Sequence, residues 1–215
     1  MCSIMARGWL ITFEGGEGAG KSTQVARLAP RIAALGRGVV TTREPGGSPG
    51  AEAIRNLLVE GAADRWSPIA ETLLMYAARR DHIERVIAPA LERGAVVVCD
   101  RFADSTRAYQ GAGGGAPGGL IEALEAHVLG AVRPDLTLIF DLPVEVGLAR
   151  AAGRAGAETR FEAKGLEFHR RLREAFLAIA RAEPERCLVI DAAPDEGAVA
   201  AAVWAAVAGR LESLT

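Results

Sequence analysis

The sequence has 215 residues, with 25 Lys and Arg against 27 Asp and Glu, and half of its residues are hydrophobic. This balance is typical of a folded globular protein and excludes a mainly disordered chain. A net charge of −2 without blocks of like charge favours small-molecule partners over nucleic acid or a membrane. The length favours one domain over residues 1–215, with residues 1–8 as an N-terminal tail. Without a signal-peptide pattern or a membrane-length apolar stretch, we expect a cytoplasmic protein.

Five short apolar segments are each followed by a polar residue, and each has the length of a β-strand. They cover residues 9–13, 39–42, 95–99, 136–140 and 188–190. Their hydrophobicity is continuous, as in parallel strands that are buried on both faces. The segments between them repeat their apolar residues with helical period, at 25–35, 69–91, 120–129 and 168–179. The order predicts one doubly wound α/β domain with a five-stranded parallel sheet, whose ligands bind at the carboxyl ends of the strands.

A glycine-rich stretch interrupts this order at residues 111–119, which read GAGGGAPGG. Glycine and proline in this density disfavour a regular helix or strand. We expect a flexible surface loop here, and a functional lid is the alternative.

The segment after the first predicted strand reads GGEGAGKST, and it matches the phosphate-binding pattern GxxxxGK[ST] between a strand and a helix. Glycines let backbone N–H groups surround phosphate oxygens at a helix N-terminus. We expect Lys21, one of two lysines in the chain, to reach the β- and γ-phosphates, and Ser22 to bind Mg²⁺. The predicted ATP-binding residues are Gly15, Gly16, Glu17, Gly18, Ala19, Gly20, Lys21, Ser22 and Thr23. A glycine-rich turn without function is the alternative.

The sequence lacks a motif that would select guanine as the base of the nucleotide. GTP-dependent switches read guanine with an NKxD motif, and the only asparagine of this chain, Asn56, precedes leucine. The sequence therefore disfavours a GTPase of that kind. Arginines at 43, 79 and 101, near predicted strand ends and on a helix, favour a second phosphate compound as acceptor.

Three linked motifs resemble one family. Residues 99–110, CDRFADSTRAYQ, are similar to the signature of thymidylate kinases, and TREPGG at 42–47 and FEGGEGAGKST at 13–23 match that family too. The spacing of the motifs agrees with the family over nearly the whole chain, from Trp9 to Ile190. The resemblance implies the P-loop nucleoside monophosphate kinase fold, a homodimer, and Mg²⁺-assisted phosphorylation of dTMP to dTDP by ATP.

The resemblance also implies roles for charged residues. Arg79 and Arg101 hold the acceptor phosphate with Arg43 close by, and Arg101 contacts both phosphates. Asp100 contacts Mg²⁺ through water and orients Arg101, unless it only caps a neighbouring loop. Glu17 contacts the sugar hydroxyl and the phosphate region of the acceptor.

Polar and apolar residues complete the expected acceptor site. Tyr109 packs against the deoxyribose where a 2′-hydroxyl would clash, and Ser105, Thr106 and Gln110 hydrogen-bond the base. Met75 stands where the family usually has a phenylalanine stacked on thymine, and its thioether can cover a ring without aromatic geometry. Core positions are the alternative for Tyr109 and for Met75.

A Gly/Ala-rich segment at about 147–163 predicts a mobile lid with arginines at 150, 154 and 160. It resembles the bacterial subgroup of the family, in which a lid arginine stabilises the transition state. Arg154 is the first candidate and Arg150 the second, with a solvated basic helix as the alternative. The predicted catalytic residues are Lys21, Arg101, Arg154, Arg150 and Glu17.

Two other functions remain open at this stage. The loss of phenylalanine at Met75 leaves a kinase for another nucleoside monophosphate or a small phosphorylated acceptor. A P-loop switch or motor would instead hydrolyse ATP without an acceptor. The three histidines show neither metal-ligand spacing nor a paired nucleophile, so no chemistry is assigned to them.

Overall fold

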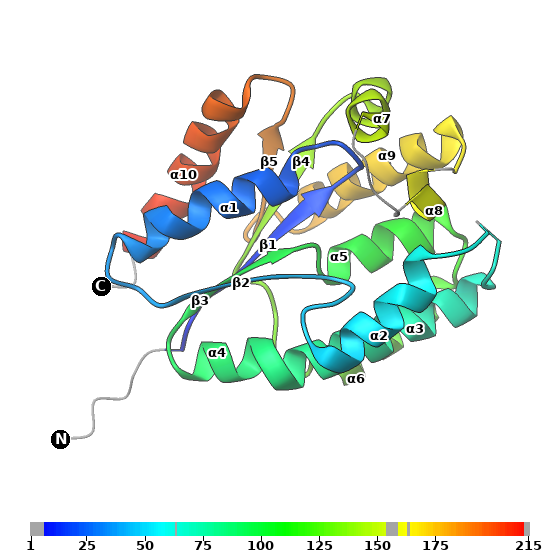
Figure 1. Cartoon of the computed structure of the whole chain (residues 1–215), viewed down its shortest axis with the longest axis horizontal. Coiled ribbons are helices and arrows are strands. Elements are labelled where there is room, and N and C mark those ends of the chain that lie inside the picture. Colours follow the sequence, from blue (N-terminus) through cyan, green and yellow to red (C-terminus); the bar gives the residue numbers. More distant parts are fainter. Residues whose placement is uncertain (1–6, 63, 154–158, 163, 213–215) are drawn as a thin grey trace.

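In the computed structural model, residues 7–62, 64–153, 159–162 and 164–212 are described. The five predicted strands are confirmed, each within two residues of its expected limits, and all of their pairings are parallel. The strands are β1 (Leu10–Gly15), β2 (Val39–Arg43), β3 (Val96–Asp100), β4 (Leu136–Asp141) and β5 (Cys187–Asp191). Their order in the sheet is β2-β3-β1-β4-β5 (Figure 1). The first strand thus lies at the centre, and the phosphate loop that follows it has a strand end on either side.

Helices α1 (Lys21–Ala33) and α10 (Glu196–Glu212) cover one face of the sheet (Figure 1). Ile11 and Phe13 of β1 pack into the core on this side, whereas Leu10 belongs to the core on the opposite face. The side chains of β1 therefore alternate between two buried layers. This explains why the hydrophobicity of the strand is continuous in the sequence.

The opposite face is covered by helices that come from three of the predicted helical regions or that follow β3. They are α3 (Pro68–His82), the π-helical segment η1 (Ile83–Ile87), α4 (Ala88–Glu92), α5 (Ala103–Thr106), the π-helical segment η2 (Arg107–Gly113), α6 (Gly118–Leu129) and α9 (Leu166–Ala182). Apolar side chains of η1, α4 and α6 share a core with β3, while α9 packs with η2 over β4. This layer carries most of the side chains that form the candidate site.

Several helices lie outside the predicted helical segments. They are α2 (Pro49–Val59), α7 (Val144–Ala152), α8 (Thr159–Glu162) and α10, together with α5 and η2. In α10 the buried residues are Val199, Val203, Val207 and Leu211, which follow one another at helical spacing. The residues between them are mostly alanine, so the whole segment is apolar and its period is hidden. Among the described helices, none combines the length and the apolar character needed to cross a membrane.

The expected loop at 111–119 is wrong at both ends. Residues 111–113 continue the π-helical segment η2, and α6 already begins at Gly118. A Cβ on Gly113 would lie 2.6 Å from the ring of Phe168, and one on Gly114 would lie 2.8 Å from the carbonyl oxygen of Gln110. Gly113 thus permits close packing of η2 against α9, and Gly114 permits the chain to turn back on the end of η2, so these two glycines do not mark a flexible loop.

The polar residues that follow the strands lie at one edge of the sheet, as predicted. Arg43 is paired in register with Asp100, and Asp141 with Asp191. Phe13, directly before Glu14, is also level with Asp100. The carboxyl ends of the strands thus bring charged groups from distant parts of the sequence to the side where the phosphate loop lies.

Candidate active site

The phosphate loop connects β1 to α1, and its last residue, Gly20, has φ 82° and caps the helix. Lys21 is the first residue of α1, and its Nζ donates to the carbonyl oxygens of Gly15 at 3.1 Å and Gly16 at 2.7 Å. Burial is the largest influence on Lys21 and lowers its pKa to about 8. The ammonium group of Lys21 therefore lies inside the turn of the phosphate loop, beside the N-terminal N–H groups of α1.

The loop is in direct contact with α7. A Cβ on Gly18, which has φ 68°, would lie 1.9 Å from the carbonyl oxygen of Gly147, and a Cβ on Gly147 would lie 2.5 Å from that of Glu17. Only glycine at both positions allows this approach of two backbones. The segment predicted as a lid thus begins in contact with the phosphate loop.

The two predicted metal-binding residues lie together. Ser22 on α1 donates its hydroxyl to Asp100 Oδ2 at 2.5 Å, although 78 residues separate them in sequence. They meet because β3 is the neighbour of β1 in the sheet. A hydroxyl and a carboxylate are hard oxygen donors of the kind that Mg²⁺ prefers.

Arg101 joins the phosphate loop to the layer formed by α5 and η2. It donates to the carbonyl oxygen of Gly15 at 2.8 Å, to Glu17 Oε1 at 3.0 Å and to the hydroxyl of Ser105 at 3.3 Å. Its φ of 68° lies in the left-handed region, which non-glycine residues rarely adopt and which costs about 1–3 kcal/mol. A strained backbone is thus retained where the guanidinium turns toward the loop.

Glu17 is held by two partners. Tyr109 donates its hydroxyl to Glu17 Oε1 at 2.6 Å, and the guanidinium of Arg101 lies over the Tyr109 ring. Burial by itself would raise the pKa of Glu17, but Arg101 and Lys21 lower it to about 2. This carboxylate in the phosphate loop is therefore ionised at neutral pH and balances two cations.

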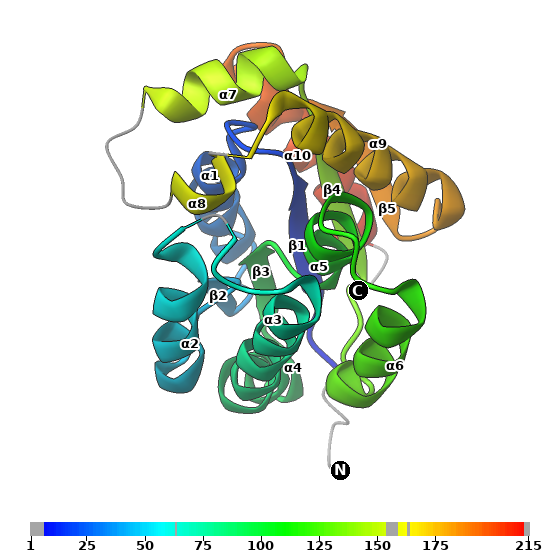
Figure 2. The same ribbon diagram turned by 90° about the vertical axis from the view of Figure 1, so that its right-hand side faces the viewer.

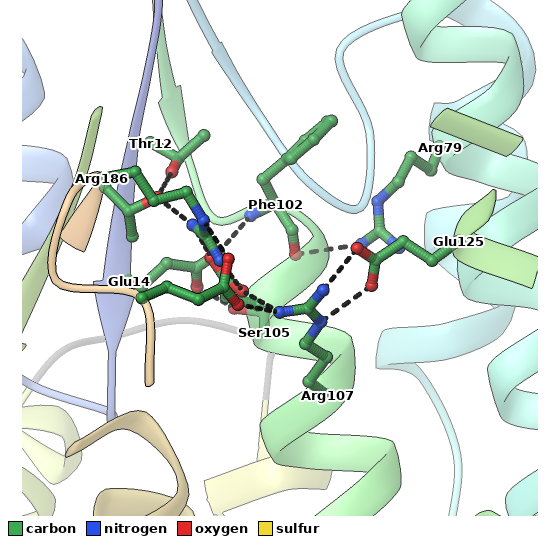
Figure 3. A network of polar contacts seen from close by, with 11 residues as sticks. Thr12, Glu14, Arg79, Phe102, Ser105, Arg107, Glu125 and Arg186 are labelled. Carbon is green, nitrogen blue, oxygen red and sulfur yellow. Dashed lines mark hydrogen bonds and ion pairs between the residues drawn. The ribbon is translucent and has the colours of Figure 1, made fainter. Parts of the chain in front are cut away.

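Glu14, the residue before the loop, supports the turn that carries Arg101 (Figure 3). It is fully buried, and its two oxygens accept the N–H of Phe102 at 2.8 Å and the hydroxyl of Ser105 at 2.5 Å. Burial and the nearby charge of Asp104 raise the pKa of Glu14 to about 8. Glu14 was not predicted as a site residue, because a carboxylate at the end of a strand has no distinguishing pattern in the sequence.

A cavity opens beside the loop, with about 720 Å³ of space that is continuous with solvent. Every residue expected to bind the acceptor, except Arg43, lines it. The lining residues are Glu17, Glu44, Pro45, Arg55, Val59, Met75, Arg79, Arg101, Phe102, Ser105, Thr106, Tyr109, Gln110 and Phe161. We call this cavity the acceptor pocket.

Arg79 is buried in the wall of the acceptor pocket, with 3% of its surface exposed. Its Nε donates to Glu44 at 2.7 Å, and its Nη2 donates to the carbonyl oxygen of Phe102 and to the Thr106 hydroxyl, both at 3.0 Å. His82 donates its Nδ1–H to the other oxygen of Glu44, at 2.9 Å. Among the residues that the structure describes, none hydrogen-bonds to the Nη1 of Arg79. A buried donor without a partner is costly, so this nitrogen is available to an oxygen of a ligand.

Arg43 does not come to the acceptor pocket. Its side chain is exposed and donates to Glu52 of α2 at 3.1 Å. Its neighbour in the TREPGG motif, Glu44, faces the pocket instead, since adjacent residues of an extended strand point to opposite sides.

Comparisons with known proteins agree with this geometry. The sequence model of the thymidylate kinase family matches residues 13–203. The thymidylate kinase of Caulobacter vibrioides is 70% identical over 207 residues, which are 96% of this chain and 99% of that protein. That of Nitrobacter winogradskyi is 57% identical over 95% of this chain and 90% of its own length. The crystal structure of thymidylate kinase from Ehrlichia chaffeensis superposes with a TM-score of 0.77 at 34% identity, covering 94% of this chain and 99% of that one.

The chain belongs to the thymidylate kinase family. The family is one of phosphotransferases, and the match to a solved member confirms the predicted fold, a five-stranded parallel sheet with helices on both faces.

In the thymidylate kinase fold of this chain, the first arginine of the predicted lid lies beside the phosphate loop. Arg150 lies near the end of α7 and donates to the carbonyl oxygens of Ala192 at 3.0 Å and Ala193 at 3.2 Å. A second open cavity there is lined by Arg150, Pro194 and the phosphate-loop residues 18–20. Arg150 thus lies across the loop from the acceptor pocket.

Of the other two arginines of the predicted lid, only Arg160 is among the described residues. Arg154, the first candidate for the transition state, lies outside the described residues. Arg160 on α8 is buried, forms an ion pair with Glu71, and donates to the carbonyl oxygens of Leu58 at 2.9 Å and Ala62 at 3.1 Å. The burial of Arg160 disagrees with the alternative of a solvated basic helix at this position, because α8 packs against α2.

Proposed function

We propose that the protein transfers the γ-phosphoryl group of ATP to dTMP and produces dTDP. The observation that carries this proposal is the position of Arg101, which contacts the phosphate loop through Gly15 and also lines the acceptor pocket. A cation between two phosphate sites fits transfer from one nucleotide to another. A hydrolytic switch or motor has no use for the second pocket.

We assign the donor side to the phosphate loop. Backbone N–H groups of the loop hold the phosphates of ATP, and Lys21 neutralises the β- and γ-phosphates. Ser22 and Asp100 hold Mg²⁺, which supplies positive charge to the transferred group when bound. No covalent enzyme intermediate is required, because the phosphate oxygen of the acceptor is the nucleophile.

In the acceptor pocket, Arg101 and Glu17 lie at the end next to the phosphate loop, and we assign them to the acceptor phosphate and sugar. Met75 and Gln110 line the pocket with them, and we assign both to the base. The Nη1 of Arg79, which has no partner within the described part of the chain, can donate to an oxygen of the acceptor. The buried ion pair with Glu44 holds that guanidinium in place before any ligand binds.

Tyr109 separates the sugar end from the core. Its ring packs edge-on against Phe161, Phe168 and Phe176, at centroid distances of 5.6–6.3 Å. Its hydroxyl is held by Glu17, so the ring cannot turn aside for a larger sugar. This arrangement supports the proposal that a 2′-hydroxyl is excluded.

The proposal is tested by measuring ADP release from ATP and Mg²⁺ with dTMP, its ribose analogue, dUMP, dCMP, dGMP, dAMP or no acceptor. We expect turnover to require dTMP and the ribose analogue to be poor. Activity spread over several acceptors would favour a broader kinase, for which Met75 in place of phenylalanine is the specific argument. ADP release without an acceptor would contradict the kinase assignment.

We further propose that the protein is a cytoplasmic homodimer, as the family resemblance implies. Leu57 on α2 and Ile69 and Leu73 on α3 expose about 39–48% of their surface, and these two helices pack side by side. Such side chains would be covered in a dimer. Light scattering on the intact protein and on a Leu73→Asp variant tests this, and a monomeric intact protein would contradict it.

A further inference from the structure

We propose that Glu71 and Arg160 are positioning residues that determine which base the acceptor pocket takes, by fixing the orientation of the Gln110 amide. This inference rests on the proposed function and deepens it. Neither residue lines the acceptor pocket, so both act through Gln110.

The three side chains form a buried hydrogen-bonded series that leads away from the pocket. Gln110 of η2 donates its Nε2 to Glu71 Oε1 at 2.9 Å. The other oxygen of Glu71, Oε2, forms an ion pair with Arg160. All three side chains are almost completely excluded from water, with 1% of Gln110, 5% of Glu71 and 2% of Arg160 exposed. Burial makes the hydrogen-bonding direction of each group costly to change.

The hydrogen bonds of this series can run in one direction only. A guanidinium can only donate hydrogen bonds, and an ionised carboxylate can only accept them. Glu71 therefore accepts from Arg160 on one side and requires a donor on the other, which is the amide nitrogen of Gln110. Within the described residues, no protein donor bonds to the amide oxygen of Gln110. The amide oxygen of Gln110 is therefore left to accept a hydrogen bond from the ligand.

This direction matters because pyrimidine bases differ in what they present. Thymine has an N–H donor at N3, whereas cytosine has an unprotonated nitrogen that accepts there. A pocket that offers the Gln110 oxygen favours the imide of thymine and leaves two acceptors facing each other with cytosine. Sites that hydrogen-bond a substrate group discriminate strongly against an analogue that lacks it.

Helix α8 carries both Arg160, the last residue of this hydrogen-bonded series, and a residue of the pocket wall. Arg160 also donates to the backbone carbonyls of Leu58 and Ala62 at the end of α2, so the helix is seated against that element (Figure 2). The next residue, Phe161, lines the acceptor pocket and packs edge-on against Tyr109 at 5.6 Å. This part of the predicted lid therefore acts on the nucleoside end of the acceptor.

The test is Glu71→Gln, which keeps the shape and adds one donor. The oxygen of glutamine at this position accepts from Arg160, and its nitrogen must then face Gln110. The Gln110 amide turns over in response and presents its nitrogen to the pocket. We expect the ratio of kcat/KM for dTMP over dCMP to fall at least about tenfold, with binding of the two nucleotides measured by calorimetry shifting in the same sense.

Glu145→Gln is the matched control, because it removes an exposed ion pair with Arg170 by the same substitution. Its ratio should equal that of the intact protein. Should Glu71→Gln fail to fold, Glu71→Gln/Arg160→Met removes both buried charges, which is tolerated better than an unpaired charge. The same loss of selectivity is expected from the double variant, since its Gln110 is also released.

The outcomes separate this inference from the proposed function. If the intact protein lacks dTMP-dependent turnover, the proposed function fails. If it turns over dTMP but a folded variant keeps the full dTMP-over-dCMP ratio, Glu71 and Arg160 only stabilise the structure and the inference is wrong.

Discussion

The phosphate loop and the acceptor pocket are adjacent but are built in different ways. The loop is one continuous segment, residues 15–23, and presents backbone groups and a single lysine. The acceptor pocket draws side chains from segments between the phosphate loop and α8, and its wall contains buried ion pairs such as Arg79–Glu44. Arg101 contacts both regions.

The difference indicates that the two sites fix their ligands by different means. A loop of backbone N–H groups recognises any triphosphate, and its strength comes from local geometry at a helix end. The acceptor pocket recognises one nucleotide, and its selectivity comes from side chains whose orientation depends on groups behind them. Substitutions in the loop should therefore reduce rate for all acceptors, whereas substitutions in the pocket should alter selectivity or pH dependence.

The largest effect is expected from Lys21→Ala. Loss of the cation at the β- and γ-phosphates should lower kcat on the order of 10³-fold with every acceptor. Lys164→Ala is the control, because it removes the only other lysine, which lies over the rings of Phe161 and Phe168. Coupled ADP-release assays measure both, and similar losses in the two variants would contradict the special role of Lys21.

The next effect separates the two lid arginines. Arg154→Ala should lower kcat at least about a hundredfold while dTMP binding changes little, because a transition-state contact is lost. Arg150→Ala should mainly raise KM for ATP, since Arg150 is bonded to the segment beside α10 across the loop from the acceptor pocket. Steady-state kinetics with ATP varied measure both constants, and the reverse pattern would assign the transition-state role to Arg150.

A smaller effect concerns the pH dependence of stability on the acceptor side. Glu14 has a pKa of about 8 when folded, against an ordinary value of 4.5, so the folded state holds more protons between these values. Its contribution to the free energy of unfolding therefore falls as pH rises from about 4.5 to 8, by at most about 1.4 kcal/mol per pH unit. Glu14→Gln should remove this slope. Urea unfolding between pH 5 and pH 9 measures it, and an unchanged slope would show that Glu14 is ionised.

The smallest effect is expected from Met75→Phe. An aromatic ring on this face of the acceptor pocket should tighten dTMP binding by about 0.5–1.5 kcal/mol, through stacking beyond simple burial. Calorimetric titration with dTMP measures this. Leu35→Phe, at an exposed position after the end of α1, is the control, and it should leave dTMP affinity unchanged. Weaker binding by Met75→Phe would show that the pocket is shaped for methionine.

A feature could be predicted where its signal lies in neighbouring residues of the sequence, and it was missed where it depends on packing between distant segments. The strands and the loop at 15–23 were predicted because hydrophobic runs and a glycine pattern are local. The helix α10 was missed because alanines conceal its spacing, and residues 111–113 were misassigned because the need for glycine arose from packing on α9. Glu71 and Arg160 carry no local motif, and their contact spans 89 residues of sequence.

The sequence by itself determined the sheet, the phosphate loop and the resemblance to a family of kinases, because each depends on residues close together in the chain. Only the tertiary structure decided that Arg43 lies outside the acceptor pocket, that Arg150 and Arg160 serve different places, and that Glu14 supports the turn at Arg101. Side-chain partners are set by which elements pack together. A buried charge takes the orientation that its partner allows, and that partner is known only once the chain has folded.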